Sequence, residues 1–272
     1  MKKSLKLWEP YSFDNSKYIN ELENRKGKII RYTGSDTTGK CSYTFNELGF
    51  RADSIYKNGF KIMSIGCSVT EGVGVNDNET WPYIFSSFIE NSVNLNFAFG
   101  GRSNDFISRC LITYFDIIKP DLVLIMYTND HRRDYFTEDG TVEPYHVSRW
   151  GYFSEDKKGK ECYESFLTLS NDEENFQNWY KNHLLIKYFL ETKKCNWLWN
   201  GWFLNNNNYS DGLRFDGDFS SLDFGVDNIH PGYNSYLRYS INLFKYIKEK
   251  FPTYIPDTNI DINSIKKYNK LL

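Results

Sequence analysis

Ser68 and His230 are the two side chains with which this sequence could carry out acyl transfer. Ser68 follows a short apolar run in IMSIGCSVTEGVG, and His230 lies in DNIHPG, which also contains Asp227. A serine hydroxyl is a weak nucleophile at neutral pH and needs an adjacent base. A histidine base in turn needs a carboxylate or carbonyl to hold it in one tautomer. The three residues therefore have the types that a nucleophile, its base and an orienting acid require.

A tetrahedral intermediate also needs hydrogen-bond donors for its developing negative charge. Removing one such donor costs roughly 3 to 4 kcal/mol in serine protease chemistry. Gly101 in NFAFGG and Asn129 in YTND each follow an apolar run, as Ser68 does. The peptide N–H groups of Ser68 and Gly101 and the side-chain amide of Asn129 are therefore three candidate oxyanion donors.

The elements that must position these residues alternate between strands and helices along the chain. Strands are expected at 61–66, 93–99, 121–127 and 196–204, and helices at 79–90, 103–120, 178–195 and 234–250. This alternation predicts an α/β fold, with a parallel sheet of about five strands and helices on both faces. Ligands bind at the carboxyl ends of the strands in such a sheet, which is where the candidate residues fall.

We expect one domain over residues 1–272. Residues 1–55 and 251–272 are expected to pack on it as an N-terminal addition and a C-terminal tail. Between the Asn129 and Asp227 blocks, the long segment 131–226 is expected to form much of the substrate rim, and its first part, to about residue 170, is irregular and polar.

Four blocks, GCSVTEG, NFAFGG, YTND and DNIH, together resemble the SGNH, or GDSL-like, hydrolase superfamily. The resemblance covers roughly residues 45 to 250 and includes NELGFRADS, which is similar to a segment upstream of the serine block in many bacterial and phage members. It implies a three-layer α/β/α fold like flavodoxin. It implies Ser68 as nucleophile, with Asp227 and His230 as its partners, and an oxyanion hole of Ser68, Gly101 and Asn129.

Two positions depart from the pattern of that superfamily. Cys67 stands where the members usually have aspartate, and Tyr127 stands where they commonly have glycine. Neither change removes a catalytic group, but both alter the wall of the pocket. Cys67 is itself an alternative nucleophile, and its simpler interpretation is a small residue that fits a tight turn.

The activity implied is that of a serine esterase without a metal or organic cofactor. A small acyl group, such as acetyl, on a carbohydrate fits the polar, aromatic-rich rim. Two other functions are open: an O-acyltransferase that uses the same site, and a non-catalytic phage-associated module that binds glycans.

Three further residues are candidate substrate contacts, each with a simpler interpretation. Arg102 could bind an acidic sugar or form a surface salt bridge. His131 could contact substrate or be a solvated loop residue. Trp199 could belong to a sugar-stacking platform or pack in the core. His146 and His183 have no partner at metal-ligand spacing and are expected to be structural.

Composition narrows the class of protein further. A formal net charge of -2 gives no electrostatic footprint for nucleic acid. The five cysteines are odd in number and form no C-x-x-C pair, which argues against a disulfide framework or a zinc site. No apolar run approaches the ~20 residues of a membrane helix, and the first residues contain no apolar signal region. A cytoplasmic location is the expectation, with association with a virion left open.

Overall fold

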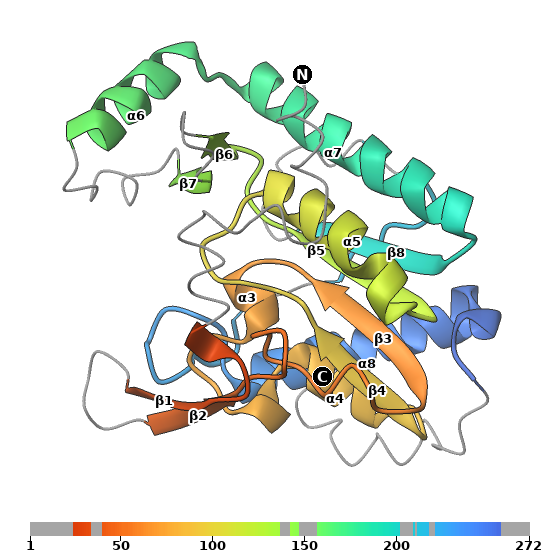
Figure 1. Cartoon of the computed structure of the whole chain (residues 1–272). Helices are drawn as coiled ribbons and strands as arrows, with labels where there is room; N and C mark the ends of the chain where they lie inside the picture. Colours follow the sequence, from red (N-terminus) through yellow and green to blue (C-terminus); the bar gives the residue numbers. More distant parts are fainter. Residues whose placement is uncertain are drawn as a thin grey trace.

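Four parallel strands form the central sheet of the computed structural model (Figure 1), which describes residues 24–33, 40–136, 142–146, 157–201, 209, 211–217 and 221–256. The strands lie in the order β4-β3-β5-β8. Their bounds are Phe60–Ile65 for β3, Ser92–Asn96 for β4, Leu122–Tyr127 for β5 and Asn196–Gly201 for β8. The expected sheet of about five strands therefore has four within the described part of the chain.

The central strand β5 shows why this sheet is parallel and covered on both faces. All six of its residues, LVLIMY, are buried. Side chains of β5 alternate between two separate apolar clusters, with Val123 and Ile125 in one and Leu122 and Leu124 in the other. A continuous apolar run of this kind is typical of a strand that helices cover from both sides.

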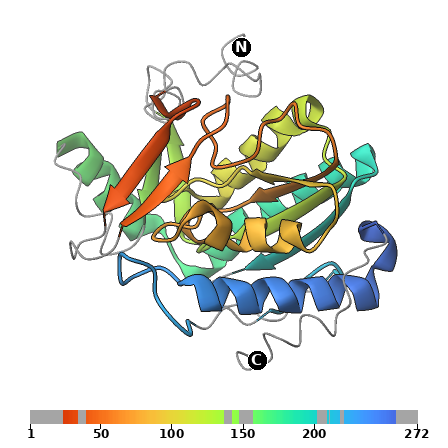
Figure 2. The same ribbon diagram turned by 90° about the horizontal axis from the view of Figure 1, so that it is seen from below.

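Two pairs of helices cover the two faces of the sheet (Figures 1 and 2). Helices α5 (Asn104–Ile118) and α7 (Asp172–Lys193) pack on one face, and α4 (Trp81–Ser87) and α8 (Tyr233–Lys250) on the other. The Ser103 hydroxyl caps α5 by accepting a hydrogen bond from the Phe106 N–H at 3.2 Å. The expected α/β fold with helices on both faces is confirmed.

The remaining elements are short and lie around this core. Strands β1 (Ile29–Thr33) and β2 (Lys40–Thr44) pair antiparallel. The short helices are α3 (Ser68–Glu71), η2 (Asp77–Glu79) and η4 (Pro252–Tyr254). No helix of the described residues is long and apolar enough to cross a membrane.

The segment after Asn129 is more regular than its sequence predicts. Strands β6 (Arg132–Phe136) and β7 (Val142–His146) form an antiparallel pair, and α6 (Lys157–Leu169) follows. Helix α7 begins six residues before the expected helix at 178, because the Asn171 side chain accepts a hydrogen bond from the Glu174 N–H at 2.9 Å. Three acidic residues then occupy the first turn of α7, where the helix dipole stabilises them.

A buried polar chain joins α7 to strands β5 and β8. The Tyr127 hydroxyl lies 3.2 Å from His183 Nδ1, and His183 Nε2 lies 3.1 Å from Asp211 Oδ2. Asp211 also accepts hydrogen bonds from the Trp199 indole and the Leu213 N–H. Burial alone would raise the pKa of Asp211, but the bonds from His183, Trp199 and Leu213 outweigh it and lower the pKa to about 2. His183 is thus structural, as expected, whereas the side chain of His146 lies outside the described residues.

We expect Asp211→Asn to lower the free energy of unfolding by about 2 kcal/mol at neutral pH, because it weakens a buried, charge-assisted network. The folded pKa of Asp211 lies below its ordinary value of 3.8, so this stabilisation is present above that pH and is lost as the pH falls toward about 2. Urea unfolding of wild type and variant between neutral pH and pH 2 measures the difference. Asp116→Asn is the control, since Asp116 is 73 % exposed. A wild-type–variant difference that stays constant with pH would contradict the assignment.

Candidate active site

Ser68 lies where β3 ends, as the first residue of the one-turn helix α3. Its peptide N–H therefore has no intrahelical acceptor. Gly66, two residues earlier, allows the close turn: a Cβ there would lie 2.2 Å from the Thr70 hydroxyl oxygen and 3.0 Å from the Met126 carbonyl oxygen. The G-C-S block is thus a tight strand-to-helix turn that leaves the Ser68 side chain half-buried.

The glycine pair after β4 lies beside this serine. A Cβ added to Gly100 would lie 3.6 Å from the Ser68 Cβ. The Gly100 N–H donates to Glu71 Oε2 at 2.7 Å, whereas the Gly101 N–H donates no hydrogen bond within the described residues. Gly101 has a φ of 75°, which favours glycine there. Of the two glycines, Gly101 is therefore the one whose N–H is free for a ligand.

Asn129 follows β5, the strand next to β3, and is partly exposed. The Asn104 side chain holds its backbone by donating to the carbonyl oxygens of Thr128 and Asn129 and accepting from the Thr128 N–H. The Nδ2 atom of Asn129 lies 3.5 Å from His131 Nε2, and the Oδ1 atom of Asn129 has no hydrogen-bond partner among the described residues. The side-chain amide of Asn129 therefore makes only one long polar contact with the described residues.

Asp227 and His230 form a close pair on the loop before α8. His230 Nδ1 lies 2.6 Å from Asp227 Oδ2, and Asp227 Oδ1 accepts from the N–H groups of Ile229 and His230. Burial would raise the pKa of Asp227, but the hydrogen bonds from His230 and Ile229 hold it below its ordinary value. The carboxylate therefore stays ionised at neutral pH and fixes one ring nitrogen of the histidine.

The Asp227 loop docks on the turn that follows α3. The Gly74 carbonyl accepts from the Val226 N–H at 2.8 Å, and a Cβ on Gly74 would lie 2.9 Å from Asp227 Oδ1. Ser68 and His230 share no hydrogen bond in this structure. The Ser68 hydroxyl instead donates a long hydrogen bond of 4.0 Å to Cys67 Sγ. Hydrogen bonds between a nucleophile and its base are often long before substrate binds. The turn thus holds the Asp227 loop against the segment that follows Ser68.

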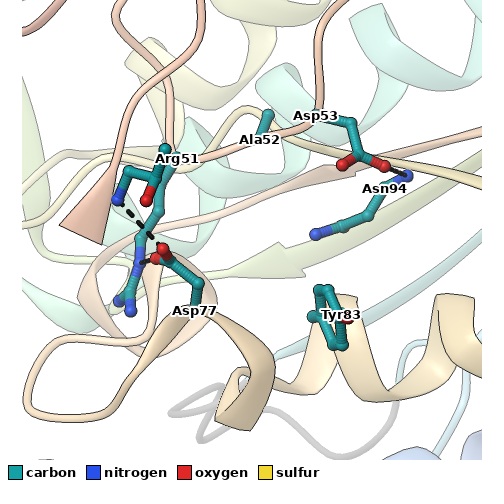
Figure 3. A pocket seen from close by; sticks show the side chains of 7 residues that line it. Arg51, Ala52, Asp53, Asp77, Tyr83 and Asn94 are labelled. Carbon is teal, nitrogen blue, oxygen red and sulfur yellow. Dashed lines mark hydrogen bonds and ion pairs between the residues drawn. The ribbon is translucent and has the colours of Figure 1, made fainter. Parts of the chain in front are cut away.

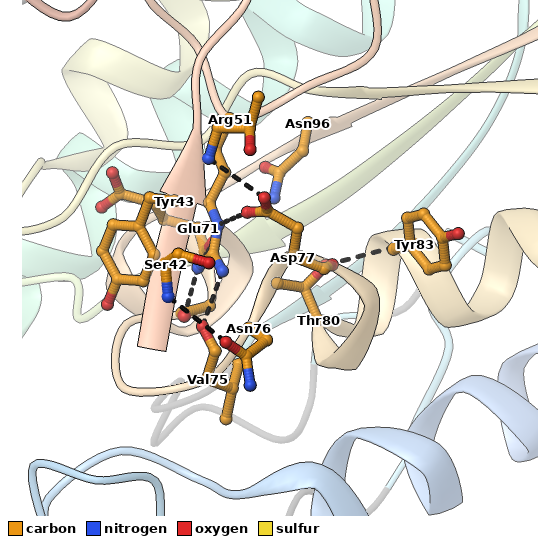
Figure 4. Close-up of polar contacts among 12 residues, drawn as sticks. Ser42, Tyr43, Arg51, Glu71, Val75, Asn76, Asp77, Thr80, Tyr83 and Asn96 are labelled. Atoms are coloured by element: carbon orange, nitrogen blue, oxygen red, sulfur yellow. Dashed lines mark hydrogen bonds and ion pairs between the residues drawn. The ribbon is translucent and has the colours of Figure 1, made fainter. Parts of the chain in front are cut away.

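Arg51 holds that turn in place (Figure 4). Its guanidinium donates to the carbonyl oxygens of Glu71, Gly72 and Val75 at 3.1, 2.6 and 2.6 Å. Its Nε donates to Asp77 Oδ1 at 2.6 Å. The guanidinium also lies 3.9 Å from the centre of the Tyr43 ring, whose hydroxyl accepts from the Gly74 N–H. Among the described residues, every backbone N–H and carbonyl group from residue 71 to 75 has a hydrogen-bond partner except the Val73 carbonyl.

Glu71 is a second residue that residue types alone did not single out. Its buried carboxylate accepts from the Gly100 N–H and forms an ion pair with Arg25 at 2.8 Å. The Arg25 guanidinium lies 4.1 Å from the centre of the Phe99 ring. Glu71 therefore fixes the glycine turn beside Ser68, and Arg25 compensates its charge. In the sequence, only their positions within the motifs NELGFRADS and GCSVTEG could have drawn attention to Arg51 and Glu71. Neither residue type suggests a role in acyl transfer at those positions.

The three residues expected to contact the substrate differ in how far they are buried. Trp199 is only 1 % exposed and packs in the core, which is the simpler of its two interpretations and leaves no ring face for a sugar. Arg102 is also buried, and its guanidinium lies 4.6 Å from the centre of the Phe99 ring. His131 is half-buried beside Asn129; burial lowers its pKa, and Asp130 opposes that shift. Of the three side chains, only that of His131 is partly exposed.

The neighbouring Cys67 is buried, which leaves Ser68 as the more accessible of the two candidate nucleophiles. Among the described residues, no three His, Cys, Asp or Glu side chains lie close enough together to hold a metal ion.

Comparison with known proteins finds similar chains among solved structures. No family model and no curated protein matches the chain. Among solved structures, a carbohydrate acetylesterase family member from Sinorhizobium meliloti is similar over 71 % of this chain and 99 % of its own, with 9 % identity and a TM-score of 0.34. A lipolytic protein of the G-D-S-L family from Veillonella parvula is similar over 71 % and 98 %, with 16 % identity and a TM-score of 0.33. Similarities with such low TM-scores add nothing to what the chain's own geometry shows.

We expect Arg51→Met to lower the free energy of unfolding by about 3 to 5 kcal/mol, because it leaves Asp77 and three carbonyl groups without their buried donor. Urea unfolding measures this loss. Lys57→Met is the matched control, since Lys57 is an exposed cation paired with Asp53. Equal stability of the two variants would show that the turn does not depend on Arg51.

Proposed function

We propose that this chain is a serine esterase of the SGNH type, with Ser68 as nucleophile and Asp227–His230 as its base and orienting acid. The single observation that carries the proposal is the 2.6 Å contact between Asp227 Oδ2 and His230 Nδ1, on a loop that hydrogen-bonds the turn after Ser68. A nucleophile, a base in reach and a third group that orients the base form the arrangement of a catalytic triad.

In the proposed reaction, Ser68 Oγ attacks the carbonyl carbon of the ester while His230 Nε2 takes the hydroxyl proton. The oxyanion accepts hydrogen bonds from the N–H groups of Ser68 and Gly101 and from the Asn129 amide. The intermediate collapses when His230 returns the proton to the leaving alcohol. Water then attacks the acyl-enzyme, His230 takes its proton, and the acid leaves with Ser68 restored.

The electrostatics of the acid–base pair support this assignment. Asp227 keeps its charge because of the hydrogen bonds from His230 and Ile229. An ionised Asp227 accepts from Nδ1 and leaves Nε2 of His230 as the nitrogen that can take a proton. It also stabilises the imidazolium that forms during attack.

For the substrate we propose an acetyl ester on a carbohydrate. The support is chemical: Asn129 is followed by Asp130, His131 and Arg132, which are polar and partly exposed beside the proposed oxyanion hole. Such a rim suits a hydroxylated alcohol rather than a long acyl chain. Transfer of the acyl group to a sugar hydroxyl in place of water would use the same residues.

A non-catalytic glycan-binding module is the second candidate. The observation that favours it is that Ser68 and His230 share no hydrogen bond in this structure. The activity of the purified chain separates the two functions, as the following experiments describe.

Ser68→Ala should lower the rate of p-nitrophenyl acetate hydrolysis by about 10³-fold or more, and His230→Ala by a similar factor, because the two groups act as a unit. Cys67→Ala is the matched control, one residue away, and should keep activity within a few fold. Wild-type activity in Ser68→Ala would refute the mechanism, and loss of activity in Cys67→Ala alone would transfer the role to the thiol. A wild-type chain with no activity on short-chain or sugar acetates would favour the binding module.

Gly74→Ala tests the contact between the turn and Asp227. The new Cβ would lie 2.9 Å from Asp227 Oδ1, at a φ of 87°, so we expect kcat to fall about tenfold or more as the carboxylate is displaced. Gly212→Ala is the matched control, because Gly212 has a φ of 80° but no atom within 4 Å of the added Cβ. Both variants should lose about 1 kcal/mol of stability from backbone strain. If both lose kcat equally, the contact with Asp227 has no catalytic importance.

A further inference from the structure

A pocket lies beside β4, apart from the residues proposed for catalysis (Figure 3). It is bounded by β2, the segment 51–53, the η2–α4 region and β4, and its cavity volume is about 120 Å³. None of its lining residues belongs to the proposed triad or oxyanion hole, although Arg51 and Asp77 also hold the turn after Ser68.

Asn94 is the feature of this pocket that points to a ligand. The residue is 7 % exposed, yet its side-chain Oδ1 has no hydrogen-bond partner among the described residues. Its backbone is fixed, since the Asn94 N–H donates to Asp53 Oδ2 at 3.0 Å and its carbonyl accepts from the Asp53 N–H. Figure 3 shows the amide extending into the space bounded by Asp77 and Tyr83. A buried amide oxygen without a partner costs about 1–3 kcal/mol, which a hydrogen-bonding ligand would recover.

The charges around the pocket decide which kind of ligand fits. Asp53 and Asp77 both line it, which disfavours an anion. Lys57 pairs with Asp53 at 3.0 Å and Arg51 with Asp77 at 2.6 Å, so no net negative charge is left for a cation. The carboxylates keep acceptor capacity, as a carboxylate has about four lone-pair sites. A neutral ligand with several hydroxyl groups matches this set.

Tyr83 supplies a flat apolar surface beside these polar groups. It projects from α4 and is 41 % exposed, and its ring borders the pocket. The C–H face of a pyranose is apolar and packs flat on an aromatic ring, while the hydroxyl groups at its edge bind carboxylates and amides. We propose that this pocket binds one neutral sugar residue of a glycan, with Tyr83 as the platform and Asn94, Asp53 and Asp77 as hydrogen-bond partners. The proposal goes beyond the esterase activity and stands without it.

The test uses the Ser68→Ala chain, so that no ester is turned over, and saturation-transfer NMR with a defined panel. The probes are glucose, galactose, mannose, xylose and N-acetylglucosamine, together with cellotetraose, xylotetraose and chitotetraose. We expect at least one probe to bind, and the further change Tyr83→Ala to weaken it about fivefold or more. Tyr83→Phe should keep the binding, since it keeps the ring. Tyr56→Ala is the matched control, because Tyr56 is 80 % exposed and lies outside the pocket.

Two outcomes would overturn the proposal: no binding of any probe by the Ser68→Ala chain, or binding that Tyr83→Ala leaves unchanged. Tyr83→Ala made on the wild-type chain should hydrolyse p-nitrophenyl acetate at the wild-type rate, because Tyr83 is no part of the proposed catalytic machinery. This readout separates the two proposals. Sugar binding can fail while the esterase persists, and an inactive chain can still bind sugar through Tyr83.

Discussion

The buried Arg51 guanidinium is the interaction on which the geometry of the candidate site depends. The side chain is only 2 % exposed, so its charge would be costly without partners. Asp77 and three carbonyl oxygens of the 71–75 turn compensate it, and the Tyr43 ring lies against it. That turn directly follows the short helix that begins at Ser68, and its Gly74 carbonyl accepts a hydrogen bond from Val226 in the Asp227 loop. A single buried cation thus joins the N-terminal addition, the serine turn and the loop before α8.

Two buried carboxylates, Glu71 in α3 and Asp227 against the turn that follows it, have different partners. One carboxylate oxygen of Glu71 forms an ion pair with Arg25, and the other accepts a hydrogen bond from the Gly100 N–H. Glu71 therefore shapes the glycine turn without adding an uncompensated negative charge near the proposed oxyanion hole. Asp227 faces a histidine and backbone N–H groups, and its pKa is lowered. Because each carboxylate has its own partners, one can position backbone while the other supports a base.

How much the sequence predicts depends on the range of the interactions. The apolar run of β5 and the capped helix after Ser103 are local signals, and the structure has both elements there. The candidate residues fall at strand ends because parallel strands share one carboxyl edge. Arg51 and Glu71 could not be assigned a role, since their partners lie about twenty to thirty residues or more away in the chain. Trp199 was ambiguous because alternation alone does not tell a buried face from an exposed one.

Covalent labelling with a fluorophosphonate, followed by peptide mass spectrometry, tests the central claim most directly, because the reagent reacts with a serine only when a base activates it. We predict one adduct on Ser68 in the wild-type chain and none after His230→Ala, with both chains folded by circular dichroism. An unlabelled wild-type chain, or an adduct on Ser68 that forms equally fast without His230, would contradict the account of an activated serine at the end of β3.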